Sequence, residues 1–342
     1  MRLLRVLDLT YTQISTLPHC IGKLKLLKLL NLSSTRIEEV PICVRSLKSL
    51  LMLYLSRCKQ LQRLPEWINE LKCLQYLNIL HCHDDLQSHM PKGISELVSL
   101  RVLRSGYLRL SVEDDGLLKL QDVAKLTHLQ VPCLWVQHEK ELKSIEDGIL
   151  AQLLKMRDLS IASGLSTETH LPQNITALQD LQILALKRFA FPNWVCTVIN
   201  LRQLTLKNCH SSDYPGLEAM PNLIRLKLDV NERCREIPKA FGKSAGFPKL
   251  RFLIIKDFPV LKELPDLEDG AMGMVEILHI VKCGRVKKVP EGVEGLRKLR
   301  VFRYGETGTD QFRESLREDG EVWNKIKAKN PHVDIKAKVE WD

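Results

Sequence analysis

The sequence predicts an α/β solenoid, with a parallel sheet on the concave side of an open horseshoe and short helical or 3-10 returns on its convex side. Three observations predict this fold. Aliphatic residues recur in a fixed pattern, and prolines recur at one stage of that pattern. The 342 residues are 44% hydrophobic and 27% charged, with a formal net charge of +10, which supports a buried core and excludes a disordered chain.

The aliphatic pattern reads Leu-x-x-Leu-x-Leu followed by a polar or small residue. Clear copies start at Leu4, Leu27, Leu50, Leu74, Met156, Leu181, Leu201, Leu223, Leu250 and Val275, and weaker ones at Leu100, Leu126 and Leu299. Each Leu-x-Leu stretch is expected to be a short parallel strand with alternate leucines pointing inward. One copy cannot bury its own leucines, so about 13 stacked copies form a leucine-rich-repeat solenoid.

A short side chain follows each strand, where it is expected to bond main-chain groups that the turn leaves unpaired. This turn column consists of Thr12, Thr35, Cys58, Cys82, Cys209, Asn231 and Cys283. It assigns a structural role to four of the ten cysteines. The sequence has no CxxC pair, and no apolar leader follows Met1, so we predict free thiols and a cytoplasmic location with no membrane span.

Prolines mark the start of each convex return. The column contains Pro18, Pro41, Pro65, Pro91, Pro172, Pro192, Pro221, Pro238, Pro265 and Pro290. Proline fixes its own φ and holds the preceding residue in an extended conformation, which suits a chain that leaves the core. Apolar residues then recur at three-residue spacing, as at Ile21, Leu24 and Leu27, which favours short helical or 3-10 turns.

Changes in this register predict four segments. Residues 1–103 are regular repeats, and residues 104–155 are irregular repeats with a helical insert, including a helical pattern over 139–154. Repeats resume over 156–309. Residues 310–342 are a C-terminal cap, because Phe312, Leu316, Trp323 and Ile326 form an amphipathic pattern that can cover the last copy.

Several segments resemble a known family. These are LDLTYTQISTLPHCIGKLKLLKLLNLSSTRIEEVP at 7–41, LPEWINELKCLQYLNILHC at 64–82, FPNWV at 191–195 and EVWNKIKAKNPHVDI at 321–335. They are similar to the leucine-rich-repeat region of plant intracellular nucleotide-binding leucine-rich-repeat (NB-LRR) disease-resistance proteins of the coiled-coil class. The resemblance implies a role in defence, by sensing a pathogen effector or a guarded host protein, or by restraining a nucleotide-binding module.

The sequence also departs from those receptors. Gly22-Lys23 and Gly242-Lys243 lack the other residues of a GxxxxGK[ST] phosphate-binding loop, so no nucleotide site and no cofactor are predicted. The pattern begins at Leu4 with nothing in front to cover the first strand. We therefore expect a truncated receptor, a fragment of a gene, or a repeat-only relative that a partner caps.

The concave face of the later copies is predicted to be basic, because residues between the strand leucines point to that side. The candidate partner-binding residues are Lys187, Arg188, Lys207, Arg225, Lys227, Lys256, Lys282 and Arg303, flanked by Arg202, Arg251 and Arg300 and opposed by Asp229 and Asp257. Leu29, Met52 and Ile254 are expected to add exposed apolar contacts. We predict a docking surface for an acidic protein; the alternative is a solvated polar face that keeps the array soluble.

Other functions fit the residues less well. Nucleic-acid binding lacks interleaved aromatic residues, apart from Tyr54 and Phe252 in distant copies. A zinc site at His81, Cys82, His83 and His89 is disfavoured because Cys82 belongs to the turn column. No GxSxG or HExxH motif occurs, so no enzyme activity is predicted. The competing function is a constitutive scaffold for small-GTPase or kinase signalling, but the ragged proline spacing favours the immune receptor.

Overall fold

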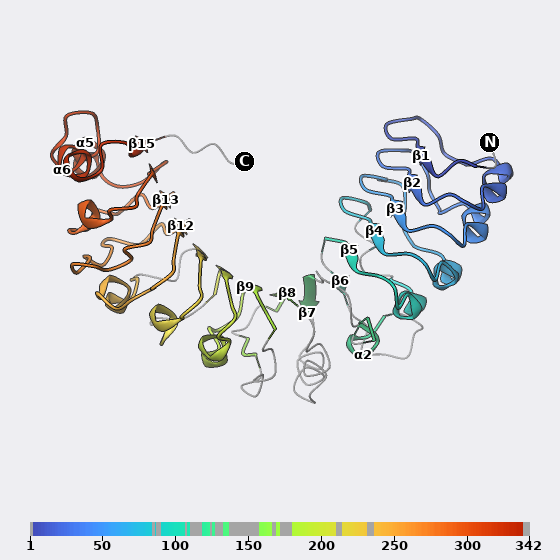
Figure 1. Ribbon diagram of the computed structural model, residues 1–342, viewed down its shortest axis with the longest axis horizontal. Helices are drawn as coiled ribbons and strands as arrows, with labels where there is room; N and C mark the ends of the chain where they lie inside the picture. Colours follow the sequence, from blue (N-terminus) through green and yellow to red (C-terminus); the bar gives the residue numbers. More distant parts are fainter. Residues whose placement is uncertain are drawn as a thin grey trace. The chain divides into compact units, whose positions relative to one another are not determined.

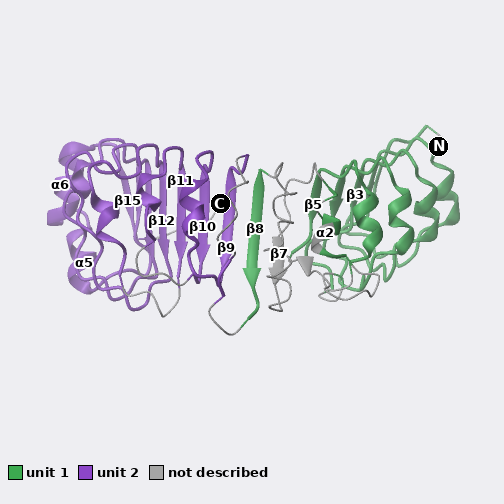
Figure 2. Cartoon of the chain, turned by 90° about the horizontal axis from the view of Figure 1, so that it is seen from below, with its two compact units in different colours: residues 1–165 green, residues 166–342 purple. Residues whose placement is uncertain are grey.

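The computed structural model describes residues 3–83, 86, 90–106, 108–109, 118–123, 125–126, 133–136, 157–165, 169–171, 180–209, 214–230 and 236–337. The chain divides into two compact units, residues 1–165 and 166–342, which Figure 2 colours separately. Both units repeat a short parallel strand followed by a turn and, in most copies, a short 3-10 helix (Figure 1). The predicted leucine-rich-repeat solenoid is confirmed.

Unit 1 begins with a five-stranded parallel sheet. Its strands are β1 (Val6–Asp8), β2 (Leu29–Asn31), β3 (Met52–Tyr54), β4 (Tyr76–Asn78) and β5 (Val102–Arg104). The returns hold η1 (His19–Lys23), η2 (Ile42–Ser46), η3 (Glu66–Glu70) and η4 (Lys92–Glu96). Helix α2 (Leu120–Val123) follows, and β6 (Leu108–Arg109), β7 (Cys133–Val136) and β8 (Asp158–Ser163) pair in parallel in that order.

Unit 2 continues the same plan. Its strands are β9 (Ile183–Lys187), β10 (Gln203–Lys207), β11 (Arg225–Asp229), β12 (Phe252–Lys256), β13 (Ile277–Val281), β14 (Val301–Arg303) and β15 (Asp334–Lys336). Its helices are η6 (Asn193–Thr197), η7 (Leu217–Ala219), η8 (Lys239–Gly242), η9 (Val293–Gly295), α5 (Asp310–Ser315) and α6 (Glu321–Lys329). Each strand pairs in parallel with the next along the chain.

The predicted leucines form the core. Leu30, Leu53 and Leu77 are aligned on β2, β3 and β4, and none of the three exposes any side-chain surface. Leu204 and Leu226 have the same relationship on β10 and β11. Each such burial contributes roughly 1.5–3 kcal/mol, and every contribution depends on the neighbouring copy being in place.

The prolines act as predicted in most described copies. Pro18, Pro41, Pro65, Pro91, Pro192 and Pro238 stand directly before a 3-10 helix, each with an extended ψ between 130° and 150°. The Pro18 carbonyl accepts the first helical bond, from Ile21 N–H at 3.0 Å. The prediction for Pro221 was wrong, because it lies in the turn that follows η7, and Pro172 lies outside the described residues.

A residue with left-handed backbone conformation follows the strand in many copies. Its φ is 57° at Ser34, 60° at Arg57, 51° at Asn208 and 58° at Asp257. This conformation aims the N–H at the next copy, so that Arg57 N–H donates to Leu80 O at 2.8 Å and Asn208 N–H to Asp229 O at 2.7 Å. The ladder between copies thereby extends past the strand, which offsets the roughly 1–2 kcal/mol cost of the conformation.

The turn column also binds main-chain carbonyls as predicted. Thr35 Oγ1 donates to Leu32 O of its own copy at 2.7 Å. The thiols reach back to the preceding copy: Cys58 Sγ donates to Leu32 O at 3.1 Å and Cys82 Sγ to Leu55 O at 3.0 Å. Thr307 continues the column, since its hydroxyl donates to Ile280 O at 2.8 Å. Asn231 lies outside the described residues.

The closing segment contains a strand that the sequence pattern did not predict. Phe312 of helix α5 packs edge to face against Tyr304, and helix α6 contacts both α5 and η9. The chain then returns to the sheet, where β15 pairs with β14 through Phe302 and Ile335. The four predicted segments stay predictions, because most of 104–155, including the helical pattern over 139–154, lies outside the described residues.

The turn-column thiols are predicted to resist alkylation in the folded protein. Burial raises the pKa of Cys82 to about 12 and the pKa values of Cys209 and Cys283 to about 11, whereas Cys20 and Cys73 are exposed. With iodoacetamide at pH 8, the three buried cysteines should react about a hundredfold more slowly than the two exposed ones, because little thiolate forms. Mass spectrometry of labelled peptides checks this, and equal rates with and without denaturant would contradict it.

Candidate protein-binding surface

Alternation along the strands places every second side chain on the open side of the sheet. We call the residues of β9 to β14 on that side the unit 2 sheet face. Strand pairing arranges them in rows: Ile183, Gln203, Arg225, Phe252, Ile277 and Val301; Ala185, Thr205, Lys227, Ile254, His279 and Arg303; and Lys187, Lys207, Asp229, Lys256 and Val281. Six of the eight predicted basic residues therefore lie on neighbouring strands of one surface.

A buried carboxylate anchors two of these lysines. Asp229 is only 3% exposed, and its Oδ2 lies 3.7 Å from Lys207 Nζ and 3.8 Å from Lys227 Nζ. Two ammonium groups thus share one carboxylate, so this group keeps a net charge of +1. Removing both lysines would leave a buried charge without a counter-ion, which is strongly destabilising.

An aromatic ring with a guanidinium stacked on it occupies the middle of the face. Arg225 Cζ lies 4.4 Å from the centroid of the Phe252 ring, a cation–π contact, and Arg251 Cζ lies 6.0 Å from the same centroid. Arg251 also forms a two-bond ion pair with Glu276, at 2.9 Å for each bond. Phe252 and Ile277 are half-buried, so the row offers apolar area beside a basic group.

Two predicted basic residues lie elsewhere. Arg188 and Lys282 come after the ends of β9 and β13, with φ of 62° and 56°, so they occupy the turn rather than the strand. Their placement on the concave strands was wrong by one residue, because the left-handed turn begins directly after the last strand position. Both side chains are exposed beside the unit 2 sheet face.

Other predicted contacts differ from expectation. Ile254 was predicted to be an exposed apolar contact, and this was wrong. Its side chain is only 8% exposed, so it is buried. Lys256 Nζ lies 3.4 Å from Asp257 Oδ2. Arg303 Nη2 donates to Asp334 Oδ2 at 2.7 Å and its Nη1 donates to Asp334 O at 2.9 Å. Arg303 therefore fastens the closing strand as well as contributing charge.

Unit 1 presents an apolar row that the sequence reasoning had only partly identified. Val6, Leu29, Met52, Tyr76 and Val102 are aligned across β1 to β5. Val6 is 56% exposed and Met52 37% exposed, and the Tyr76 ring lies 4.9 Å from that of Tyr54. Comparing this one position across copies would have revealed the row, since it is apolar or aromatic in all five strands. Contiguous exposed apolar area of this kind marks interaction surfaces.

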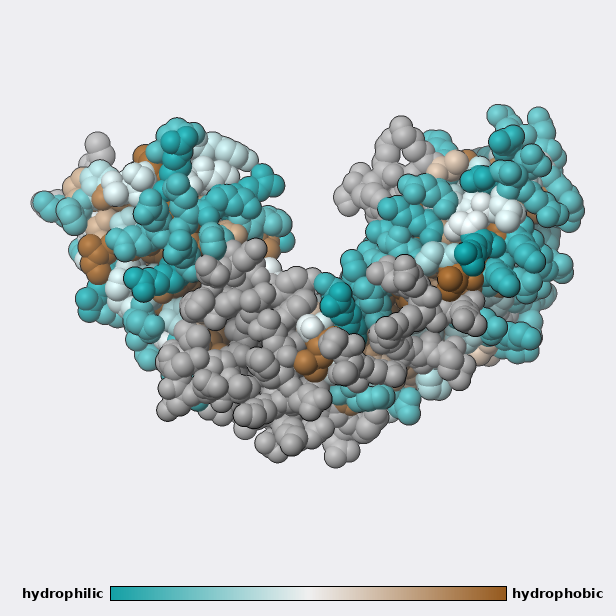
Figure 3. Space-filling view, turned by 180° about the vertical axis from the view of Figure 1, so that it is seen from behind, coloured by the Kyte–Doolittle hydropathy of each residue, from teal (hydrophilic) through white to brown (hydrophobic). Residues whose placement is uncertain are grey.

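The flanks of the units differ from these faces. In Figure 3 the described residues of both units are mostly hydrophilic, with scattered apolar side chains.

His279 lies in the middle row of the unit 2 sheet face, where burial and the nearby Arg303 and Arg225 lower its pKa, so it is uncharged at neutral pH. The unit 2 sheet face therefore carries its positive charge on lysine and arginine.

The structure describes three of the four residues of the zinc hypothesis, His81, Cys82 and His83. Cys82 is buried and its thiol is bonded to Leu55 O, which leaves it unsuited to metal binding. His81 is exposed, and His89 lies outside the described residues. Among the residues that the structure describes, no group of three His, Cys, Asp or Glu side chains is arranged to hold a metal ion.

Replacing Arg303 should loosen the closing strand. In Arg303→Met, both bonds to Asp334 are lost, and the free energy of unfolding should fall by about 1 kcal/mol at pH 7, with faster amide exchange in β15. Arg303 lowers the pKa of Asp334, so this stabilisation is present above the usual carboxyl pKa and is lost as the pH falls. The difference in the free energy of unfolding between the wild type and Arg303→Met should therefore shrink towards pH 3.

The control for this experiment is Arg300→Met, which removes an exposed cation next to the same strand. It should leave the exchange of β15 unchanged. Equal exchange in the wild type and Arg303→Met at pH 7 would show that the pair with Asp334 does not hold β15 in place.

Comparison with known proteins agrees with the geometry. A family model described as a leucine-rich repeat region matches residues 1–303. A disease resistance RPP8-like protein of Arabidopsis thaliana is 26% identical over 71% of this chain and 29% of its own length. The disease resistance protein RPP8 of the same plant is 27% identical over 80% of this chain and 32% of its own length. The chain thus spans about a third of these relatives.

Solved structures show the fold alone. An internalin of Listeria monocytogenes covers 99% of this chain and 88% of its own, with 14% identity and a TM-score of 0.60. In the part of the chain that the structure describes, no helix has both the length and the apolar composition to cross a bilayer. The predicted resemblance to the repeat region of plant NB-LRR disease-resistance proteins is confirmed, and the chain belongs to the leucine-rich repeat region family.

Proposed function

We propose that the chain is a protein-recognition solenoid that acts in plant disease resistance. One observation carries the proposal: the unit 2 sheet face surrounds apolar side chains with lysine and arginine on adjoining strands. Protein interfaces combine an apolar, often aromatic centre with arginine and a charged rim. The relatives are named as disease resistance proteins, which supports the process in which recognition takes place.

The chemistry of the face favours an acidic protein partner. Lys207, Lys227 and Asp229 together keep a positive charge, and Arg225 adds another beside Phe252. Such charge increases the rate of encounter with an acidic surface, while burial of Phe252 and Ile277 slows dissociation. The partner is a pathogen effector, a guarded host protein or a nucleotide-binding module.

Switching would follow from differential affinity. A partner bound to the unit 2 sheet face changes the state of a nucleotide-binding module only if it binds the two states of the receptor unequally. A shift from mostly inactive to mostly active receptor needs a difference of about 5.5 kcal/mol. Acidic groups that meet Arg225 and an apolar side chain that meets Phe252 would together supply part of that difference.

Neutralising two cations of the unit 2 sheet face should weaken association with an acidic partner. We choose Arg225→Gln with Lys187→Gln, because Lys207 and Lys227 hold the buried Asp229. The chain is co-expressed in leaf tissue with a nucleotide-binding module encoded in its own genome, and co-precipitation and cell death are scored. The double variant should retain about a tenth of the association, since two charge contacts contribute about 1.4 kcal/mol.

The matched control removes two cations from the exposed turn before β14, as Arg297→Gln with Lys298→Gln. It should bind as the wild type does. Equal losses of association in both double variants would show that the effect depends on net charge alone, and would contradict a binding role for the unit 2 sheet face. Absence of any association or effect on cell death with the wild-type chain would favour the scaffold for small-GTPase or kinase signalling.

A further inference from the structure

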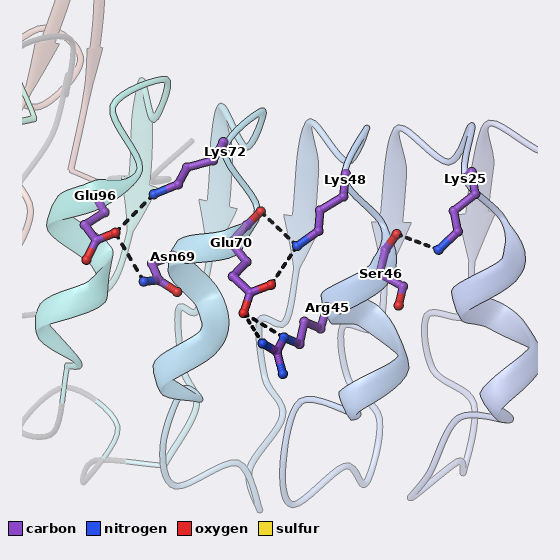
Figure 4. A network of polar contacts seen from close by, with 8 residues as sticks. All are labelled: Lys25, Arg45, Ser46, Lys48, Asn69, Glu70, Lys72 and Glu96. Atoms are coloured by element: carbon purple, nitrogen blue, oxygen red, sulfur yellow. Dashed lines mark hydrogen bonds and ion pairs between the residues drawn. The ribbon is translucent and has the colours of Figure 1, made fainter.

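The convex returns of unit 1 are joined by rungs of polar contacts, which Figure 4 shows from close by. Each rung has an acceptor at the fifth residue of one return. Its donors are the fourth and seventh residues of the preceding return, counted from the residue after proline. Because adjacent returns have the same conformation, equivalent residues meet in the same geometry from rung to rung.

The rung between η2 and η3 is complete. Glu70 Oε1 accepts from Arg45 Nε at 2.7 Å, and its Oε2 accepts from Lys48 Nζ at 2.8 Å. Lys48 Nζ also donates to the main-chain O of Glu70 at 3.4 Å. Hydrogen bonds from Arg45 and Lys48 lower the pKa of Glu70 to about 2, which shows how strongly this position favours an anion.

The next rung, between η3 and η4, repeats the arrangement. Glu96 Oε2 accepts from Asn69 Nδ2 at 3.2 Å and from Lys72 Nζ at 3.1 Å. Hydrogen bonds from Lys72 and Asn69 lower the pKa of Glu96 as well. Two successive returns thus hold a carboxylate at the same place.

The rung between η1 and η2 has the cation but no anion. Lys25, which is equivalent to Lys48, donates from Nζ to the main-chain O of Ser46 at 3.1 Å. Ser46 stands where Glu70 and Glu96 stand in the later copies, and Gly22 takes the place of Arg45. Within the part of the chain that the structure describes, the half-buried Ser46 has no hydrogen bond from its hydroxyl. Lys25 is therefore already directed at a position that lacks negative charge.

We propose that Ser46 is a phosphorylation site, and that the phosphate it acquires binds Lys25 and completes the first rung. Ser46 Oγ attacks the γ-phosphorus of a nucleoside triphosphate held by a protein kinase. The new O–P bond forms as the bond to the β-phosphate oxygen breaks; the hydroxyl proton passes to the kinase base and the nucleoside diphosphate leaves. Phosphoserine has about the reach of glutamate and carries a charge of about −1.5 to −2.

Neighbouring serines lack these features. The Ser95 hydroxyl donates to Lys92 O at 2.8 Å inside a buried turn. Ser33 and Ser56 bond each other at 3.0 Å on the open side of the sheet. Ser49 is half-buried in the turn after η2, and no described lysine is directed at it, so it is the matched control. The basic residues Arg45 and Lys48 flank Ser46 in sequence, which suits kinases that recognise basic residues.

The site is tested first in the cell that would modify it. The full chain is expressed in leaf tissue and cleaved after glutamate. The peptide of residues 40–66, which contains both Ser46 and Ser49, is measured by fragmentation mass spectrometry with and without phosphatase treatment. Phosphate on Ser46 at an occupancy at least tenfold above that on Ser49 is the expected result. Peptides that cover Ser46 and carry no phosphate would overturn the proposal.

The role of Lys25 is tested with phosphoserine incorporated at a single position during synthesis of the full chain. Phosphoserine at 46 should slow amide exchange in η1 and η2 about threefold to tenfold at pH 7. The effect should shrink towards pH 5, because the stabilising phosphate dianion is lost as the pH falls through its second pKa near 6. Phosphoserine at 49 should leave exchange unchanged.

The variant Lys25→Met separates the rung from a general effect of charge. With Lys25→Met, phosphoserine at 46 should give no protection beyond that of the unmodified variant. Protection that persists in Lys25→Met, or no protection in the wild-type chain, would overturn the assignment of Lys25 as the phosphate ligand. Either result is independent of partner binding by the unit 2 sheet face.

Discussion

Burial of the strand leucines between neighbouring copies is the constraint on which the rest of the structure depends. Leu53 and Leu204 reach zero exposure only because a copy stands on each side of them. The same stacking sets the main-chain ladder, which continues through residues in the left-handed conformation after the strand. It also explains why short hydroxyl and thiol side chains suit the turn. Each one bonds a nearby main-chain carbonyl, and the space between stacked copies is too small for a longer side chain.

The constraint leaves the open side of the sheet free to vary. Outward positions need only fit beside their neighbours in the row, so unit 1 carries an apolar row and unit 2 a mixed basic and aromatic one. Charges there are still not independent. Asp229 holds two lysines, and Arg303 is joined to the closing strand, so stability and recognition share some of the same side chains.

The sequence predicted what each copy requires by itself. Inward leucines, prolines before the returns and the turn-column cysteines follow from local period and backbone chemistry, and these were confirmed in the described copies, apart from Pro221. Contacts between copies were harder to foresee. The bond between Arg303 and Asp334, the pairing of β15, and the meeting of Lys25 with Ser46 join residues far apart in the chain, so no local pattern reveals them. The turn positions of Arg188 and Lys282 were missed because the strand ends one residue earlier than the charge pattern indicated.

The unit 2 sheet face can bind a partner only if the copies form one continuous hydrogen-bonded stack within each unit. Amide exchange tests that stack most directly. The N–H groups of Arg57, Asn208 and Asp257 lie beyond the strands yet donate to the following copy. Measured residue by residue, they should be protected as strongly as the mid-strand amides of Leu53 and Leu204. Exchange as fast as that of exposed turn residues such as Lys298 would show that neighbouring copies do not form one hydrogen-bonded stack, and would contradict the account.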